Sequence, residues 1–390
     1  MSGRHHLFVP GPSNIPDRVL RAMHRASEDH RSVAFPHLVL PLLRDTARLL
    51  GAEPDRVALF MASGTGGWEV ALTNTLPPGA QVLLPCAGHF ANLWGDSARR
   101  LGFAVETVPE MEWGDAPSPE RIASILAADT HHRFAAILVV HNETSTGVTA
   151  DLPAIRAAID KAGHPALLMI DGVSSIGSLE YRHDDWRVDV AITGSQKGLM
   201  LPAGLAIVAF SERALAAANT VTGPRAYFDL RPMLAQNADG YFPYTPSIPM
   251  LYGLRESVGM LLDEGLDQVA QRHARLARGV RAAVAAWRLP ICCRNAASTS
   301  NTVTTIMTPA GIDARKIVSH AFTKYDLSLG GGLGPLAGKA FRIGHMGWLN
   351  EGMLFGALGL TAMALTDCGV PASAADACAA AAAVWHGDAS

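Results

Sequence analysis

The 390-residue chain is poor in charged residues, and the charges it carries are nearly balanced. Charged residues make up 17% of the sequence, and the formal net charge at pH 7 is −3. Such a chain lacks the basic surface that proteins use to bind nucleic acid or an anionic membrane. We therefore expect neither nucleic acid nor a membrane among its partners.

Cysteine is scarce as well. The five cysteines are Cys86, Cys292, Cys293, Cys368 and Cys378. They form no C-x-x-C pair, and their odd number does not suit a disulfide framework. We expect reduced thiols that pack in the interior, and no metal site.

Long apolar runs are also missing. The longest, 353–365, is too short to cross a bilayer, and 1–12 contains no apolar stretch resembling a signal peptide. These absences predict a cytoplasmic protein.

Apolar residues, by contrast, make up 49% of the sequence, enough to bury a large core. Over the first 260 residues, short apolar runs alternate with amphipathic segments, which is typical of a mostly parallel sheet covered by helices. The expected strands are 57–61, 81–85, 103–108, 135–140, 166–170, 188–193 and 205–210. The expected helices between them are 67–75, 91–101, 119–127 and 152–162. The pattern predicts an α/β fold with a seven-stranded sheet.

The pattern changes after about residue 250. The elements expected there are a long helix at 249–287 interrupted near Gly265, a strand at 302–308, a helix at 313–324, a glycine-rich turn at 330–334, a strand near Phe341, and helices to the end, including 372–383. We expect an N-terminal segment at 1–20, a large domain at 21–255 and a smaller C-terminal α+β domain at 256–390.

Two polar residues follow successive expected strands, where each strand ends. Asp171 follows the apolar run 166–170, and Lys197 follows 188–193, between Gly194 and Gly198. Lysines in loops are usually surface residues, but a partly desolvated amine is what a Schiff-base lysine requires. Open α/β sheets bind ligands at these strand ends, and pyridoxal phosphate needs an anion beside its ring nitrogen. The pair therefore predicts a pyridoxal phosphate site, with Lys197 holding the cofactor and Asp171 paired to the ring nitrogen.

A glycine-rich turn, Ser63-Gly64-Thr65-Gly66-Gly67-Trp68-Glu69, follows the first expected strand. It is not G-x-G-x-x-G, because Glu69 stands where the third glycine belongs, and it lacks the Lys-Ser/Thr of a Walker A loop. Backbone N–H groups at such a helix start can still bind a phosphate.

Six segments together resemble the class V aminotransferases, in order, from about residue 8 to residue 365. They are Pro10-Gly11-Pro12-Ser13-Asn14, Ser63-Gly64-Thr65-Gly66, His141-Asn142-Glu143-Thr144-Ser145-Thr146-Gly147-Val148, Asp171-Gly172-Val173-Ser174-Ser175, Gly194-Ser195-Gln196-Lys197 and Phe341-Arg342-Ile343-Gly344. The chain is most similar to the serine–glyoxylate and alanine–glyoxylate group, which includes aspartate-using relatives. The resemblance implies a pyridoxal phosphate-dependent fold type I homodimer with its active site at the subunit interface.

The resemblance also assigns residues to the cofactor. Thr65, Gly66 and Gln196 would bind the phosphate. Phe90 would stack on the pyridine ring and Val173 would pack beneath it, while Thr144 would hydrogen-bond the ring hydroxyl.

The other subunit would contribute Thr245, which would reach the phosphate across the interface. The family often has a tyrosine three residues before this threonine. Here that residue is Phe242, so that either Tyr241 or Tyr244 could contact the phosphate.

The expected substrate handle is Arg342, because a guanidinium binds a carboxylate through two parallel hydrogen bonds. Gly11, within 10–14, would help to enclose that carboxylate. His345 could contact substrate or simply pack nearby.

The resemblance implies transamination from a small L-amino acid to glyoxylate, with serine the first choice of donor and alanine or aspartate next. A lyase or cysteine desulfurase of the same fold is the alternative, but 327–339, where a desulfurase carries its nucleophile, has no cysteine. Cys292-Cys293 is the remaining candidate. A binding protein without enzymatic activity would be expected to lose the lysine or the aspartate, and this chain keeps both.

Overall fold

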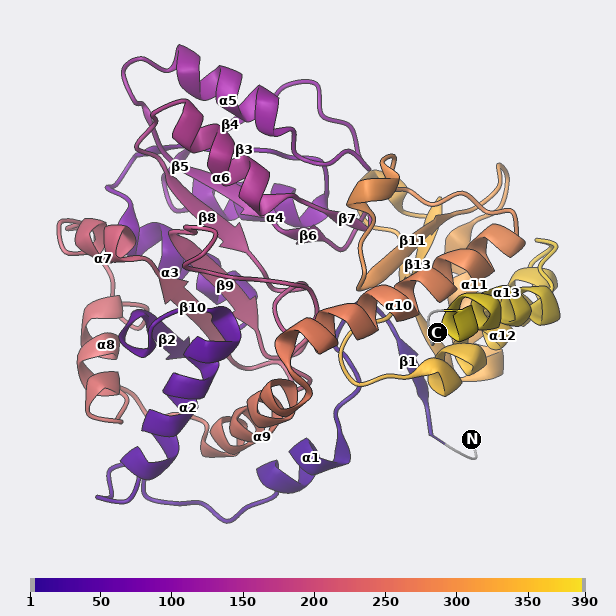
Figure 1. Ribbon diagram of the computed structural model, residues 1–390, viewed down its shortest axis with the longest axis horizontal. Helices are drawn as coiled ribbons and strands as arrows, with labels where there is room; N and C mark the ends of the chain where they lie inside the picture. The colour runs from indigo at the N-terminus through magenta and orange to yellow at the C-terminus, as the bar shows by residue number, and fades with distance from the viewer. Residues whose placement is uncertain (1–3, 388–390) are drawn as a thin grey trace.

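The computed structural model describes residues 4–387 and shows a large α/β domain beside a smaller C-terminal one (Figure 1). The large domain contains a seven-stranded sheet in the order β2-β10-β9-β8-β5-β3-β4. Its strands are β2 (Val57–Phe60), β3 (Gln81–Leu84), β4 (Ala104–Thr107), β5 (Phe134–Val140), β8 (Leu167–Asp171), β9 (Val190–Gly194) and β10 (Ala206–Phe210). Only β10 runs antiparallel to its neighbours. The expected mostly parallel sheet is confirmed.

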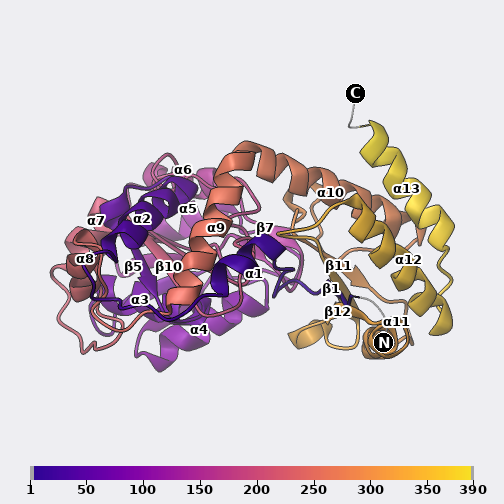
Figure 2. The ribbon, with the colours of Figure 1, turned by 90° about the horizontal axis from the view of Figure 1, so that it is seen from below.

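Helices cover both faces of this sheet, which explains why its central strands are apolar throughout. Figure 2 shows α3 (Gly64–Thr75) and α4 (His89–Arg100) on one side, with α2 (Pro36–Leu50), α5 (Pro119–Ala128) and α6 (Leu152–Lys161) on the other. The remaining helices of this domain are α7 (Glu212–Ala218), α8 (Leu230–Ala238) and α9 (Ile248–Glu264).

The smaller domain is built on a four-stranded sheet in the order β1-β12-β13-β11. Its elements are β1 (His6–Phe8), α10 (Leu266–Ala286), β11 (Val303–Met307), α11 (Ala314–Tyr325), β12 (Leu327–Gly331), β13 (Ala340–Gly344), α12 (Glu351–Asp367) and α13 (Ala374–Gly387). A second apolar core, which includes Phe8, Ile343 and Leu358, lies between this sheet and its helices.

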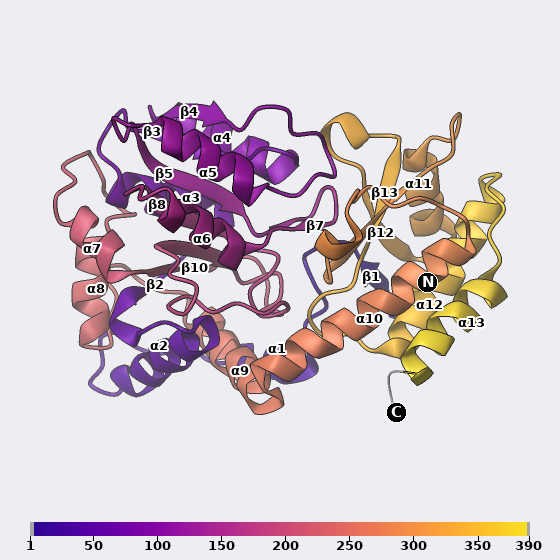
Figure 3. The ribbon, with the colours of Figure 1, turned by 45° about the horizontal axis from the view of Figure 1, so that its top comes forward.

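Two segments connect the domains. Helix α10 extends from α9 along the small domain (Figures 1 and 3), with Val269 in the first apolar core and Val280 in the second. At the other end of the chain, β1 pairs with β12, whereas α1 (Asp17–Met23) packs against α9. The boundaries expected at residues 20 and 255 stay predictions, and the ends of the outer segments, 1–3 and 388–390, lie outside the described residues.

The strand and helix predictions differ from the structure mainly at element ends. Helix α3 begins at Gly64 rather than residue 67, so the glycine-rich turn forms the first helical turn. The interruption of the long helix is confirmed at Gly265, where φ is 87°. Within residues 4–387, none of the helices has the length and apolar character needed to cross a membrane.

Candidate active site

The carboxyl ends of three neighbouring strands meet at one edge of the large sheet. Val140 at the end of β5 pairs with Asp171 at the end of β8, and Asp171 pairs with Ile192 near the end of β9. A cavity of about 170 Å³ lies there. Seven of the eleven predicted site residues line it, namely Thr65, Phe90, Thr144, Asp171, Val173, Gln196 and Lys197. The sheet topology thus brings together residues from five separate segments of sequence.

Asp171 is buried, and its side chain supplies the carboxylate that lines the cavity. Its Oδ2 accepts a hydrogen bond from Trp68 Nε1 at 3.0 Å, and its Oδ1 accepts one from the Val173 backbone N–H at 2.8 Å. Burial raises the pKa of Asp171 to about 6, and these two hydrogen bonds oppose the rise. The group is therefore mostly ionised at pH 7 but is poorly solvated, and a positive ligand group beside it would be stabilised.

Lys197 lies in the loop that follows β9, and its side chain reaches the same cavity. Its Nζ donates a hydrogen bond to the Pro10 carbonyl oxygen. Burial and, to a smaller extent, the positive charge of Arg342 lower the pKa of Lys197 to about 8, while Asp171 acts in the opposite direction. A substantial fraction of this amine is therefore neutral near pH 7.5, as a nucleophilic lysine requires.

The start of α3 forms the anion-binding end of the cavity. The Ser63 side chain makes no capping hydrogen bond, and no acidic residue lies in the first turn. Gln196 is folded toward this helix start: a Cβ placed on Gly194 would lie 2.9 Å from Gln196 Oε1 and 3.5 Å from the Gly64 backbone nitrogen. That oxygen is buried without a hydrogen-bond partner among the described residues. Uncapped N–H groups at a helix start attract a phosphate.

Arg342 approaches the cavity from β13 of the small domain. Its Nη1 donates to the Thr144 carbonyl at 3.1 Å and its Nε to the Gly331 carbonyl at 2.9 Å. Burial lowers the pKa of Arg342 to about 10, and the negative charge of Glu143 opposes this. The guanidinium stays charged at neutral pH and is held in place by carbonyl groups, so a substrate carboxylate would find a preoriented partner.

The other predicted residues lie around this cavity or away from it. Gly66 is in the first turn of α3, against the Phe228 ring. A Cβ on Gly11 would overlap the Lys197 side chain, so glycine is needed where 10–14 crosses the lysine. Thr245 is exposed and does not line this cavity.

The two tyrosines near Thr245 have different environments. The Tyr241 hydroxyl donates to the Ser32 carbonyl at 3.3 Å, and the Tyr244 hydroxyl donates to the Ala226 carbonyl at 3.0 Å. That Tyr241 or Tyr244 contacts the phosphate stays a prediction.

His345 is fully buried and does not line the cavity. Its Nε2 lies 2.9 Å from Thr304 Oγ1, and its Nδ1 lies 3.1 Å from the Asn301 carbonyl oxygen. These contacts favour the packing interpretation.

Trp68 and Asn142 also line the cavity, although their sequence positions alone assigned them no role in it. Trp68 is one helical turn beyond Gly64, so it faces the sheet and reaches Asp171. Asn142 Nδ2 donates to Ser174 Oγ and to Thr302 Oγ1, both at 2.9 Å. The position of Trp68 in the helix could have revealed it, whereas the partners of Asn142 are distant in sequence.

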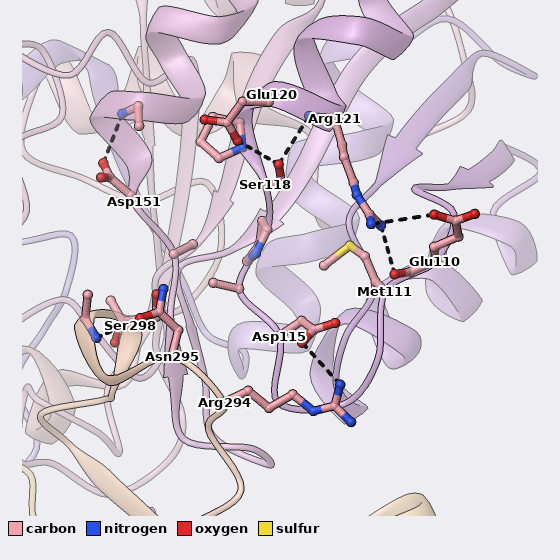
Figure 4. Close-up of a pocket in the computed structure, with 17 residues that line it drawn as sticks. Glu110, Met111, Asp115, Ser118, Glu120, Arg121, Asp151, Arg294, Asn295 and Ser298 are labelled. Atoms are coloured by element: carbon pink, nitrogen blue, oxygen red, sulfur yellow. Dashed lines mark hydrogen bonds and ion pairs between the residues drawn. The ribbon is translucent and has the colours of Figure 1, made fainter.

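A larger cavity of about 810 Å³ lies away from these residues, between the loop before α5, the start of α6 and the small domain (Figure 4). Its charged groups are already paired. Arg294 lies 3.7 Å from Asp115, Arg121 donates to the Glu110 carbonyl at 2.8 Å, and Asp151 accepts from Ala154 N at 3.0 Å. None of the side chains that line this cavity is among the described buried polar groups that lack a hydrogen-bond partner.

The residues of the smaller cavity fit pyridoxal phosphate, the cofactor expected from the sequence. The uncapped start of α3 lies at the anion-binding end, beside the Gln196 side-chain amide, whose N–H groups can donate to a phosphate. A carboxylate for the ring nitrogen and an amine of lowered pKa line the same space.

Comparison with known proteins gives consistent matches along the chain. The family model Aminotransferase class-V matches residues 5–327. The serine–glyoxylate aminotransferase of Methylorubrum extorquens is 55% identical over 94% of this chain and 92% of its own length. The L-aspartate–glyoxylate aminotransferase of Paracoccus denitrificans is 46% identical over 95% and 93%. The crystal structure of ureidoglycine–glyoxylate aminotransferase from Bacillus subtilis superposes with a TM-score of 0.90 at 28% identity, covering 99% of both chains.

Proposed function

Because this chain belongs to the class-V aminotransferases, we propose that it uses pyridoxal phosphate to transfer the amino group of a small L-amino acid to glyoxylate. The products are glycine and a 2-oxo acid. Family membership makes the chain an aminotransferase. The single observation that best supports the cofactor site is the shared cavity of Asp171 and Lys197, with the uncapped start of α3 beside them.

Each charged group has one role in this proposal. When bound, the cofactor would draw electrons away from the substrate α-carbon and carry the amino group between the two half-reactions. Asp171 would keep the ring nitrogen protonated, since its carboxylate accepts only from Trp68 and Val173 among the described residues. Lys197 would hold the cofactor in the resting enzyme and would move the proton from the substrate α-carbon, for which an amine of pKa about 8 is suited.

The remaining residues orient the ligands. The start of α3, Thr65 and Gly66 with Gln196 would bind the phosphate, and Phe90 and Val173 would enclose the ring. Thr144 would donate its hydroxyl to the ring oxygen, and Arg342 would bind the substrate α-carboxylate, enclosed by Gly11.

Serine is the preferred donor in this proposal, ahead of alanine and aspartate. The similarity to serine–glyoxylate aminotransferases supports this order, since the M. extorquens enzyme is 55% identical and the aspartate enzyme 46%. A donor with a second carboxylate would need a second cation. In this chain Arg31 is exposed beside Pro232 and Phe242, so its access to a substrate depends on a neighbouring subunit.

The proposal includes a homodimer. Thr245 is exposed on the surface of the single chain, where a second subunit could bring it to a cofactor phosphate. The free cysteines favour a reducing compartment, and we place the enzyme in the cytoplasm.

The raised pKa values of the vicinal cysteines, Cys292 and Cys293, argue against the desulfurase alternative. Burial raises the pKa of Cys292 to about 11 and also raises that of Cys293, so neither forms a thiolate readily. Neither residue lines the cavity of Lys197.

Steady-state assays with glyoxylate test the proposed substrates directly. Serine, alanine and aspartate are compared as donors, with glycine formation as the readout. The expected order of kcat/KM places serine first. A much larger value for aspartate would contradict this order, and Arg31→Ala would then test whether Arg31 binds the second carboxylate.

A further inference from the structure

A second carboxylate, that of Glu143, is buried beside the proposed cofactor site and has no role in the mechanism above. Glu143 lies in β6 (Asn142–Glu143), directly before Thr144. Its Oε1 accepts from the Ser145 backbone N–H at 3.0 Å and from Ser145 Oγ at 2.6 Å. Its Oε2 accepts from the backbone N–H groups of Phe90 at 3.0 Å and Ala91 at 3.1 Å. Four donors thus converge on one buried carboxylate.

These bonds cap a helix that has no cap of its own. Helix α4 begins after Gly88, which has no side chain to offer. Its first three N–H groups bind instead to a segment more than fifty residues away in sequence: His89 N donates to Ser145 Oγ at 2.9 Å, and the next two donate to Glu143. In contrast, α5 and α6 are capped locally by Ser118 and Asp151.

Gly88 shows how closely the carboxylate is held. Its φ of −168° is extended backbone that any residue can adopt, so conformation does not require glycine. A Cβ at this position, however, would overlap the Glu143 side chain and lie 2.6 Å from Oε2. Glycine is therefore needed here because Glu143 occupies the space.

The first turn of α4, which Glu143 caps, contains Phe90, the aromatic residue of the proposed site. Phe90 is the second residue of α4, and its side chain lines the cavity with Lys197 and Asp171. We propose that Glu143 is a positioning residue, which fixes the first turn of α4 and thereby sets the Phe90 ring against the cofactor. This inference rests on the proposed function, because it concerns how the cofactor site is built.

A carboxylate suits this role better than a neutral group. Burial raises the pKa of Glu143, and the bonds from Ser145, Ala91 and Phe90 oppose that rise. A buried charge is tolerated only when hydrogen bonds or countercharges compensate for lost solvation. Here four donors and the positive field of Arg342 do so. Since charge-assisted hydrogen bonds are stronger than neutral ones, the helix start is held more rigidly.

The test compares Glu143→Gln with a matched control, Asp129→Asn. Asp129 is also buried, and its Oδ2 accepts a backbone bond from Phe134 N at 3.0 Å. It lies before the amino end of β5, at the edge opposite the cavity. Both variants remove the negative charge of a buried carboxylate that accepts from the backbone. Asp129 accepts from one backbone N–H and also bonds to Arg133 and His164, and only Glu143 connects to Phe90.

Two readouts do not depend on turnover. The first is hydrogen exchange of the Phe90 and Ala91 amides in the cofactor-free protein, which we expect to accelerate in Glu143→Gln and not in Asp129→Asn. The second is the dissociation constant for pyridoxal phosphate, measured by absorbance titration. We expect Glu143→Gln to weaken binding by about two- to twelvefold, the range that one aromatic stack contributes. Asp129→Asn should leave it unchanged.

A double-mutant cycle separates positioning from general destabilisation. If Glu143 acts through the ring, Glu143→Gln should weaken binding by less than about twofold further in a Phe90→Leu background. Should Glu143→Gln not fold, Ser145→Ala is the milder variant, since it removes the bond to His89 N and one bond to Glu143. It should show the same two effects at smaller size.

The outcomes are distinct. Unchanged cofactor affinity in the Glu143→Gln and Ser145→Ala variants, or full additivity with Phe90→Leu, would overturn this inference while the proposed function stands. A wild-type protein that binds no pyridoxal phosphate would overturn the proposed function and this inference with it.

Discussion

The Asp171→Asn variant isolates the negative charge proposed to lie beside the cofactor ring nitrogen. Asparagine keeps the size of the side chain, and its oxygen can still accept from Val173 N. Its NH₂ group then faces Trp68 Nε1, which is also a donor. A hydrogen bond to a charged group is worth about 1.5–3 kcal/mol, so its loss should slow catalysis by about tenfold to more than a hundredfold.

The same substitution should change how stability depends on pH. Burial raises the pKa of Asp171 to about 6, roughly two units above its ordinary value, which corresponds to about 3 kcal/mol. The fold favours the protonated carboxyl. Its contribution to stability is therefore fully present below the unfolded pKa of about 4 and is lost as the pH rises through about 6. Asparagine does not titrate, so the variant does not lose stability in this way as the pH rises. Relative to wild type, the cofactor-free variant should gain about 1.4 kcal/mol between pH 5 and pH 7.5, about half of the full change.

Two measurements on one set of samples check this prediction. Urea unfolding of the cofactor-free proteins at both pH values gives the free energies, and steady-state assays at pH 7.5 give kcat/KM. Cofactor affinity should fall less than kcat. A variant within twofold of wild-type activity would refute the proposed role, and a pH-independent stability difference would refute the raised pKa.

Three further predictions concern the other site groups. Lys197→Ala should abolish turnover while circular dichroism and thermal unfolding show an intact fold, and residual turnover near the wild-type rate would contradict its role. Arg342→Ala should cost about 2–5 kcal/mol in kcat/KM for serine, alanine and aspartate alike, since it binds the carboxylate that they share. A loss confined to one donor would point to a side-chain contact instead. If Thr245 serves a neighbouring subunit, sedimentation should find at least a dimer at assay concentration, and a fully active monomer would exclude this.

Most strands of the large sheet could be predicted from sequence because they are covered on both faces and so appear as continuous apolar runs, whereas the edge strand β4 is largely exposed. Asp171 and Lys197 were found for the same reason, since each follows such a run. Helix α2 was not predicted. It begins with Pro36 and contains Pro41, and an internal proline argues against a helix.

What the sequence could not supply are contacts between distant segments. Trp68 and Asp171 are 103 residues apart, and Glu143 reaches Phe90 across 53. No local sequence pattern predicts either contact. Glu143 stands in a segment that carried the family resemblance, yet its role as a cap emerges only when α4 is placed beside β6.

The central claim is that Lys197 carries the cofactor. Borohydride reduction of the protein with pyridoxal phosphate, followed by digestion and mass spectrometry, tests it most directly. We expect a phosphopyridoxyl group on the peptide that contains Lys197, and no such group on that peptide in Lys197→Ala. A label on any other lysine, or no label on a folded protein, would contradict it.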